Sequence, residues 1–262
     1  MDQHELNDRK RWFADYCRSF YSSDHEDQRN IVLKQEHTTR VCENIVQIAR
    51  GLSLDEERAA LAEVIALYHD IGRFLQYRNF KTFKDSVSIN HASLGARVLM
   101  ESNVLRALPR HERDIILRSV TLHNVYSVPS GLDREMLFFL KLVRDADKLD
   151  ILRVAIEYYG QPEGERASAV GLGLPEVPGY SPEVLAALNN KQMVQMSALK
   201  TLNDFKLLQL TWIFDLNFAS SLRILVSRQY IEGIAAALPR SEEISSALAV
   251  LRRYVHEGLG GT

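Results

Sequence analysis

Residues 55–71 read DEERAALAEVIALYHDI, and this stretch decides the fold. Acidic side chains fill its first turn, where the positive end of a helix favours them. Apolar residues such as Leu61 and Ile65 then recur at steps of three and four, which predicts a helix with one buried face. The helix ends on His69-Asp70, an ionisable pair among residues that are being buried. A buried carboxylate is costly unless it is ion-paired, hydrogen-bonded or bound to a cation.

The same periodicity dominates the rest of the chain. We expect further helices over residues 37–50, 91–101, 111–123, 134–158, 182–203, 205–237 and 241–257. Sustained alternation of apolar and polar residues, which would indicate a half-buried strand, is absent from the sequence. The sequence therefore predicts an all-α protein.

One interval interrupts this pattern. Residues 160–182 hold five of the thirteen glycines and four of the seven prolines, a density that no helix tolerates. We expect a long loop there, either a lid over a site or a simple linker. It divides the chain into residues 1–159, a metal-binding helical core, and residues 160–262, the loop and C-terminal helices. We expect the two parts to pack as one domain.

Bulk properties exclude several classes of protein. The formal net charge of −2 gives no general reason to expect nucleic acid as a partner. Two cysteines are too few for a disulfide framework. No stretch approaches the roughly 18 to 20 apolar residues of a membrane helix, and the first residues show no apolar core of a signal peptide. We therefore expect a cytoplasmic protein without a membrane partner, and the C-terminal helices would permit a homodimer.

A second aspartate lies in the predicted 134–158 helix. Leu140, Val143, Asp147 and Ile151 follow one helical face, so Asp147 interrupts an apolar stripe. An internal salt bridge to an arginine such as Arg40 or Arg144 is one explanation. A metal ion is the other.

Three histidines stand beside apolar positions at or near the ends of predicted helices: His37, His91 and His123. A single histidine of this kind is usually structural. Several of them, together with His69, Asp70 and Asp147, form a set that is harder to explain by packing. Neutral imidazoles and carboxylates are ligands of Zn, Mn, Fe and related divalent ions, and helical bundles build such sites from side chains on facing helices.

The ordered pattern of His37, His69-Asp70 and Asp147 resembles the HD-domain superfamily of metal-dependent phosphohydrolases. The likeness covers roughly residues 30–156 and includes the strings HDIGR at 69–73 and VRDADKLD at 143–150. It implies a bundle of about five helices in which His37, His69, Asp70 and Asp147 bind one divalent ion.

The resemblance also suggests roles for His91 and His123. HD proteins with two metals use two more histidines between the HD pair and the final aspartate. His91 and His123 look like those residues, so we expect one or two ions among Mn, Fe, Zn, Ni, Co and Mg. With one ion, the two histidines would instead contact substrate or transfer protons. The sequence lacks the GYP element of the cyclic-dinucleotide phosphodiesterases, which argues against that activity.

The chemistry expected from such a centre is hydrolysis. Asp70 is the natural bridging carboxylate because it has two oxygens to share. Arg73, three residues later, would grip a phosphate or form a salt bridge to Asp70. Lys148 would screen phosphate charge, or simply be exposed.

We therefore expect a phosphohydrolase acting on a phosphoester or phosphoanhydride of a small, nucleotide-like molecule. The alternatives are an HD-fold di-iron oxygenase and a metal-containing binding or regulatory module without turnover. The sequence names no substrate.

Overall fold

The structure is a computed structural model that describes residues 1–162, 166 and 170–260. Helices connected by loops and turns make up this part of the chain, and no strand occurs in it. The all-α prediction is confirmed. The chain divides into two compact units, Met1–Asp150 and Ile151–Thr262, which we describe separately. The predicted packing of the two parts as one domain remains a prediction.

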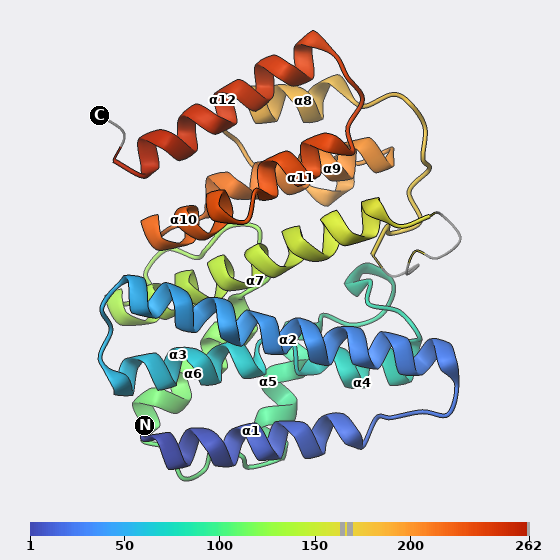
Figure 1. The fold of residues 1–262 in the computed structure, drawn as a ribbon. Coiled ribbons are helices and arrows are strands. Elements are labelled where there is room, and N and C mark those ends of the chain that lie inside the picture. The colour runs from blue at the N-terminus through green and yellow to red at the C-terminus, as the bar shows by residue number, and fades with distance from the viewer. Residues whose placement is uncertain (163–165, 167–169, 261–262) are drawn as a thin grey trace. The chain divides into compact units, whose positions relative to one another are not determined.

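The first unit holds all the residues of the predicted metal site. Its elements are α1 (Gln3–Arg18), α2 (His25–Gly51), α3 (Glu56–Tyr68), α4 (Gly72–Phe80), the 3-10 turn η1 (Asp85–Val87), α5 (His91–Glu101), α6 (Arg110–Leu122) and the first part of α7 (Arg134–Gly160). The long helix α2 lies along α3, which also contacts α1 and α6 (Figure 1). Helix α5 packs between α4 and α6.

The start of α2 corrects a prediction. We expected a helix that begins at His37, but it begins at His25 and places His37 near its middle. The Asp24 side chain accepts hydrogen bonds from the backbone N–H groups of Glu26 and Asp27, an N-cap that fixes the true start. The segment between the cap and His37 has its apolar residues together at 31–33, without helical spacing, so an apolar-periodicity argument does not find this start. The predictions for α5 and α7 agree with the structure to within two residues.

A glycine allows α5 to approach the HD motif. A Cβ atom added to Gly72 would lie 2.2 Å from the His91 carbonyl oxygen and 2.6 Å from the Gly95 nitrogen. Any other residue would therefore force α4 and α5 apart. Since His91 opens α5, Gly72 sets how closely that imidazole can approach Asp70.

The second unit also corrects the sequence-based helices. It contains α8 (Pro182–Asn189), α9 (Leu202–Thr211), α10 (Ala219–Ser227), α11 (Tyr230–Ala236) and α12 (Glu242–Gly258), with the 3-10 turns η3 (Met196–Ala198) and η4 (Trp212–Asp215). The expected helices over 182–203 and 205–237 are thus each broken into shorter pieces. Lys191 and Gln229 adopt left-handed backbone angles, with φ of 57° and 55°, that end helical geometry at two of these breaks. Helix α12 matches the prediction closely.

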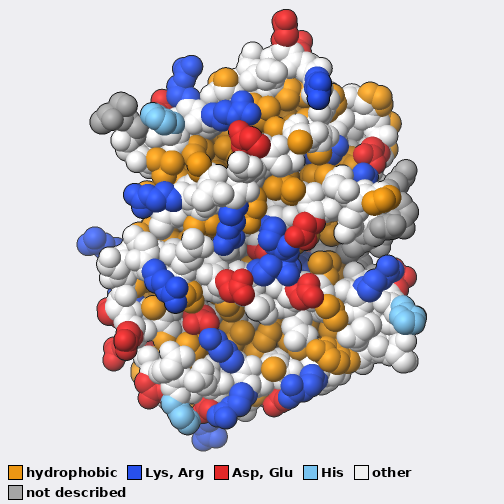
Figure 2. All heavy atoms as spheres, viewed as in Figure 1, with side chains coloured by type: hydrophobic (Ala, Val, Ile, Leu, Met, Phe, Trp, Pro, Cys, Tyr) orange, Lys and Arg blue, Asp and Glu red, His pale blue; other side chains and the backbone are white. Residues whose placement is uncertain are grey.

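Residues 161–162, 166 and 170–181 form turns and bends without a helix, as the sequence predicts for the 160–182 loop. The rest of that loop lies outside the described residues, and its role as lid or linker remains a prediction. Among the described residues, none of the helices combines the length and apolar character that spanning a bilayer demands. Acidic and basic side chains are interspersed on the face drawn in Figure 2.

Candidate metal centre

The six residues predicted as metal ligands converge in the first unit. Five helices position them: His37 lies in the middle of α2, His69 and Asp70 directly follow α3, His91 opens α5, His123 directly follows α6, and Asp147 lies in α7. The four imidazoles and Asp70 are at most 6% exposed, and Asp147 is 16% exposed. Two sets of three have donor atoms within 4.8 Å of one another. We call His37, His69 and Asp70 the first triad, and Asp70, His91 and His123 the second triad.

Asp70 belongs to both triads through different oxygens. Its Oδ2 lies 3.7 Å from His37 Nε2 and 3.9 Å from His69 Nε2. Its Oδ1 lies 3.3 Å from His91 Nε2 and 3.8 Å from His123 Nε2. The carboxylate therefore faces one pair of imidazoles with each oxygen, which is the arrangement that a bridging ligand requires.

Asp147 adjoins the first triad. Its Oδ1 is 3.1 Å from His37 Nε2 and 3.6 Å from His69 Nε2. The first triad thus has two carboxylates beside its two imidazoles, whereas the second has the single carboxylate of Asp70.

The outward-facing nitrogen of each imidazole is tied to a hydrogen-bond acceptor. His69 Nδ1 donates to the Ala66 carbonyl at 2.6 Å, and His123 Nδ1 donates to the Val120 carbonyl at 2.8 Å. A carbonyl oxygen can only accept, so the proton of each neutral ring must sit on Nδ1. In that tautomer Nε2 points its lone pair into the centre of the site.

The other two rings are held by carboxylates. His37 Nδ1 lies 2.7 Å from Asp150 Oδ2, and His91 Nδ1 lies 2.7 Å from Asp85 Oδ2. Carboxylates that orient the outer nitrogen of an imidazole are characteristic partners of metal-binding histidines. All four rings therefore present Nε2 to the interior.

Burial and charge set the protonation states of these groups. Burial opposes the ionisation of Asp70, but the positive charges of Lys34 and Arg73 hold its pKa well below the usual range. Burial likewise opposes ionisation of Asp147, but the close contacts with His37 and His69 outweigh it and hold its pKa well below the usual range. Both carboxylates are anions at neutral pH.

The imidazoles of the two triads differ. Burial, reinforced by the neighbouring His91 and His69, lowers the pKa of His123 to about 3. Burial and the positive charge of Arg73 lower the pKa of His91. For His37, burial also favours the neutral ring, but hydrogen bonds to Asp147 and Asp150 outweigh it and raise its pKa.

These groups fit a divalent cation. His91 Nε2 and His123 Nε2 are 3.1 Å apart, and His37 Nε2 and His69 Nε2 are 3.3 Å apart. His91 and His123 are neutral with their protons directed outward, so these two Nε2 atoms cannot hydrogen-bond to each other and their lone pairs repel at this distance. A cation shared by both nitrogens and an Asp70 oxygen removes that repulsion. Neutral imidazoles with carboxylates are also the donor set that such ions prefer.

The sequence analysis missed the two supporting carboxylates. Asp85 lies in η1 and contacts His91 together with the Arg73 guanidinium at 3.0 Å and the Gln76 amide at 2.9 Å. These contacts lower the pKa of Asp85, which burial would raise, to about 2. Asp150 follows Asp147 by three residues on α7, and its Oδ1 atom accepts a hydrogen bond from Arg40 Nε at 2.8 Å. That spacing was a readable signal for Asp150, but nothing local distinguishes Asp85.

Lys34 was missed as well. Its Nζ lies 2.7 Å from Asp70 Oδ2, and its side chain is 17% exposed. It precedes His37 by three residues, a spacing that places both on one helical face. This spacing is informative only if residue 34 is helical, and the helix predicted from the sequence began at residue 37.

The two residues predicted to bind phosphate, Arg73 and Lys148, have different contacts in the structure. Arg73 Nε lies 3.4 Å from Asp70 Oδ1, the salt bridge that we weighed as its alternative role. Its Nη1 also donates to the Gln76 amide oxygen and to Asp85. Lys148 is half-buried on α7, with Nζ 3.5 Å from the Arg144 carbonyl. A phosphate contact from either residue remains a prediction.

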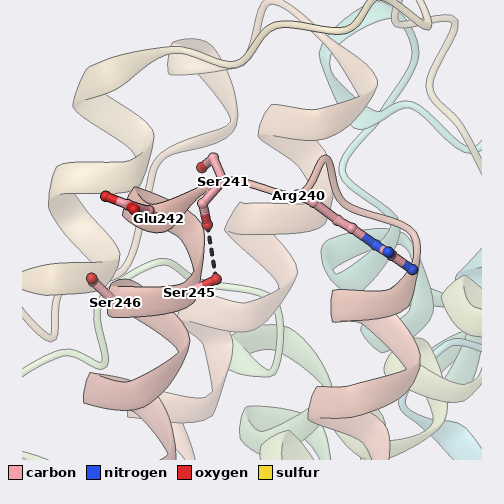
Figure 3. A pocket seen from close by; sticks show the side chains of 5 residues that line it. All are labelled: Arg240, Ser241, Glu242, Ser245 and Ser246. Carbon is pink, nitrogen blue, oxygen red and sulfur yellow. Dashed lines mark hydrogen bonds between the residues drawn. The ribbon is translucent and has the colours of Figure 1, made fainter.

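The second unit has a hollow at the start of α12, shown in Figure 3. It is lined by Arg240, Ser241, Glu242, Ser245 and Ser246. The Ser245 hydroxyl donates to the Ser241 carbonyl at 2.8 Å, an ordinary contact within a first helical turn. We assign no ligand to it.

A known protein family matches the part of the chain that contains these residues. The HD domain family matches residues 35–152, which include all six predicted ligands. Neither the curated proteins nor the solved structures give a match to this chain. HD domains typically bind divalent metals, and the buried histidine and aspartate cluster of this chain can hold one. Residues 35–152 therefore match the HD domain family, which is consistent with the HD-domain superfamily of metal-dependent phosphohydrolases that the sequence resembles.

Proposed function

We propose that the protein hydrolyses a phosphoester or phosphoanhydride bond of a small, nucleotide-like molecule. One observation carries the proposal: Asp70 turns one carboxylate oxygen toward each of two imidazole pairs. Such a centre suits a pair of divalent ions that share one ligand. Two-ion centres of this kind are common in enzymes that cleave phosphate esters.

The ligands are divided between the two triads. His37, His69, Asp70 and Asp147 would hold one ion, and Asp70, His91 and His123 would hold a second. When bound, divalent ions polarise phosphoryl oxygens and lower the pKa of water toward neutrality.

The chain's own residues prepare the site for an anionic substrate. The neutral rings of His91 and His123 leave their Nε2 lone pairs available at neutral pH, because burial lowers the pKa of both imidazoles. Arg73 balances the charge of Asp70 and joins it to Asp85, which orients His91. These contacts favour a positioning role for Arg73. Burial of the imidazoles keeps bulk water away from the ligand atoms.

The test is a substrate screen on the purified protein. Nucleoside mono-, di- and triphosphates, dinucleoside polyphosphates and simple phosphodiesters should be assayed with added Mn²⁺, Co²⁺, Ni²⁺ or Mg²⁺. We expect phosphate or nucleotide release from at least one substrate. The double variant His69→Ala with Asp70→Ala should lose that activity by at least about a thousandfold.

The matched control is His111→Ala. This histidine is in the same unit, but its side chain is 66% exposed and pairs with Glu135. It should keep full activity. An inert wild type with every metal and substrate would contradict the proposal, as would equal turnover in the double variant. Copurified iron with oxygen consumption would point instead to an oxygenase.

A further inference from the structure

We propose that Lys34 contacts the phosphate group of the substrate. The proposal rests on the proposed function and adds a specificity-determining residue to it. Lys34 projects from α2 beside the first triad, with Nζ 2.7 Å from the Oδ2 atom of Asp70. Its side chain is 17% exposed, whereas those of His37 and His69 are 6% and 0% exposed. The ammonium group therefore lies between the bridging carboxylate and solvent.

The guanidinium groups nearby are already engaged by protein acceptors. Arg40 binds Asp150 and Glu36. Arg73 binds Asp70, Asp85 and the Gln76 amide oxygen. Each guanidinium is therefore held in place by two or more protein acceptors.

Lys34 has donors to spare. An ammonium carries three N–H donors, and within the described residues a single acceptor, Asp70 Oδ2, is found for Lys34. The Phe83 ring lies 5.3 Å from Nζ and covers one side of the group through a cation–π contact. The remaining donors are left for a ligand that arrives from solvent.

The chemistry of the neighbouring groups selects an anion with several oxygens. A ligand held beside Asp70 by divalent ions would present its free oxygens close to the Lys34 ammonium. Lysine binds phosphate as a point charge, and its three donors can serve a phosphoryl oxygen while one still contacts Asp70. A neutral substrate would leave this charge without a partner. Lys34 thus favours a phosphoryl group over an uncharged substrate.

The experiment compares Lys34→Met, Lys34→Arg and Lys81→Met. Methionine keeps a chain of similar length beside Phe83 but removes the charge, and arginine keeps the charge. Lys81 is 58% exposed and pairs with Asp27, which is not a residue of either triad, so Lys81→Met is the matched control. Calorimetry would measure the Kd of inorganic phosphate for the Mn²⁺-loaded proteins, and elemental analysis would count ions per chain.

We expect Lys34→Met to weaken phosphate binding about tenfold or more, with KM of a substrate raised by a similar factor. Lys34→Arg should stay within about threefold of wild type, and Lys81→Met should match it. Ion content should not fall in Lys34→Met, since a cation that competes for Asp70 has been removed.

Unchanged phosphate binding in Lys34→Met at full ion content would overturn the proposal and leave the proposed function standing. Loss of ions in that variant would also overturn it, because Lys34 would then act by positioning Asp70. A wild type that binds no phosphate and cleaves no phosphate ester would refute both proposals together.

Discussion

The two triads use the same kinds of ligand but differ in charge and in support. The first triad lies against a second carboxylate, Asp147, whereas the second has Asp70 alone. Metal affinity rises with the number of charged ligands. We therefore expect the first triad to bind its ion more tightly and the second to exchange more readily.

The supporting residues reinforce this difference. The orienting carboxylate of the first triad, Asp150, lies within the long helix α7 and its side chain is 1% exposed. The corresponding residue of the second triad, Asp85, lies in a short 3-10 turn and its side chain is 28% exposed. A helix fixes a side chain more firmly than a turn between loops does. The second triad is thus the half of the centre that is easier to disturb.

The largest effect is expected from the residue that the triads share. Asp70→Asn replaces the bridging charge with a neutral amide, so both ions should be lost and activity should fall at least about a thousandfold. Elemental analysis of the dialysed protein measures this loss. Asp114→Asn is the control, since Asp114 is 61% exposed and pairs with Arg110 within its own helix. Retention of one ion in Asp70→Asn would show that the triads do not depend on a common ligand.

Replacing each supporting carboxylate should separate the triads. Asp85→Asn should lower the affinity for one ion and Asp150→Asn the affinity for the other, each by about 10–100-fold, because an amide orients the imidazole less strongly. Calorimetric titration of the metal-stripped variants would resolve two binding steps. Asp85→Asn should affect the weaker step and Asp150→Asn the tighter one. A change in the same step in both variants would rule out this division.

A smaller effect is expected at the contact between α4 and α5. In Gly72→Ala the new methyl group would meet the His91 carbonyl, for which the separation is 2.2 Å. The helices must shift, which should lower the free energy of unfolding by about 2 kcal/mol and weaken the second triad's ion. Thermal unfolding and metal titration report the two effects. Gly160→Ala is the control, because a Cβ there meets nothing within 4 Å.

The smallest effect concerns the pH dependence of stability after metal has been removed with EDTA. One histidine of each triad should contribute to it, with opposite signs. The pKa of His123 falls from 6.5 in the unfolded chain to about 3 in the fold. Its contribution to stability is therefore present above pH 6.5 and is lost as pH falls from 6.5 toward 3. Between pH 7 and 5.5 the loss should be roughly 1 kcal/mol.

His37 should behave in the opposite way. Its pKa is raised in the fold, so its contribution is present below pH 6.5 and is lost as pH rises through the folded value. Denaturant unfolding of wild type, His37→Gln and His123→Gln across pH 5.5 to 8 gives the two slopes. Equal slopes in the two variants would refute the electrostatic difference between the triads.

The sequence by itself determined the all-α class and brought six candidate ligands to attention. These conclusions depend on short-range patterns: apolar residues at helical spacing, and ionisable side chains such as Asp147 within them. The family comparison agrees with the fold class, and the HD domain match includes the positions from His37 to Asp147. Helix ends set by polar caps were harder to predict, as the early start of α2 at His25 shows.

Only the tertiary structure decided how those residues meet. That Asp70 faces the two triads with different oxygens and that Lys34 contacts Asp70 both depend on helices far apart in the chain. That Asp85 supports His91 depends on how the turn η1 folds back onto the start of α5. Lys34 and Asp70 are 36 positions apart, and the residues between them carry no local signal of their contact. Periodicity shows which face of a helix is buried, but not which neighbour buries it. Packing decides that, and here it depends on a contact as close as that of Gly72 with the backbone of α5.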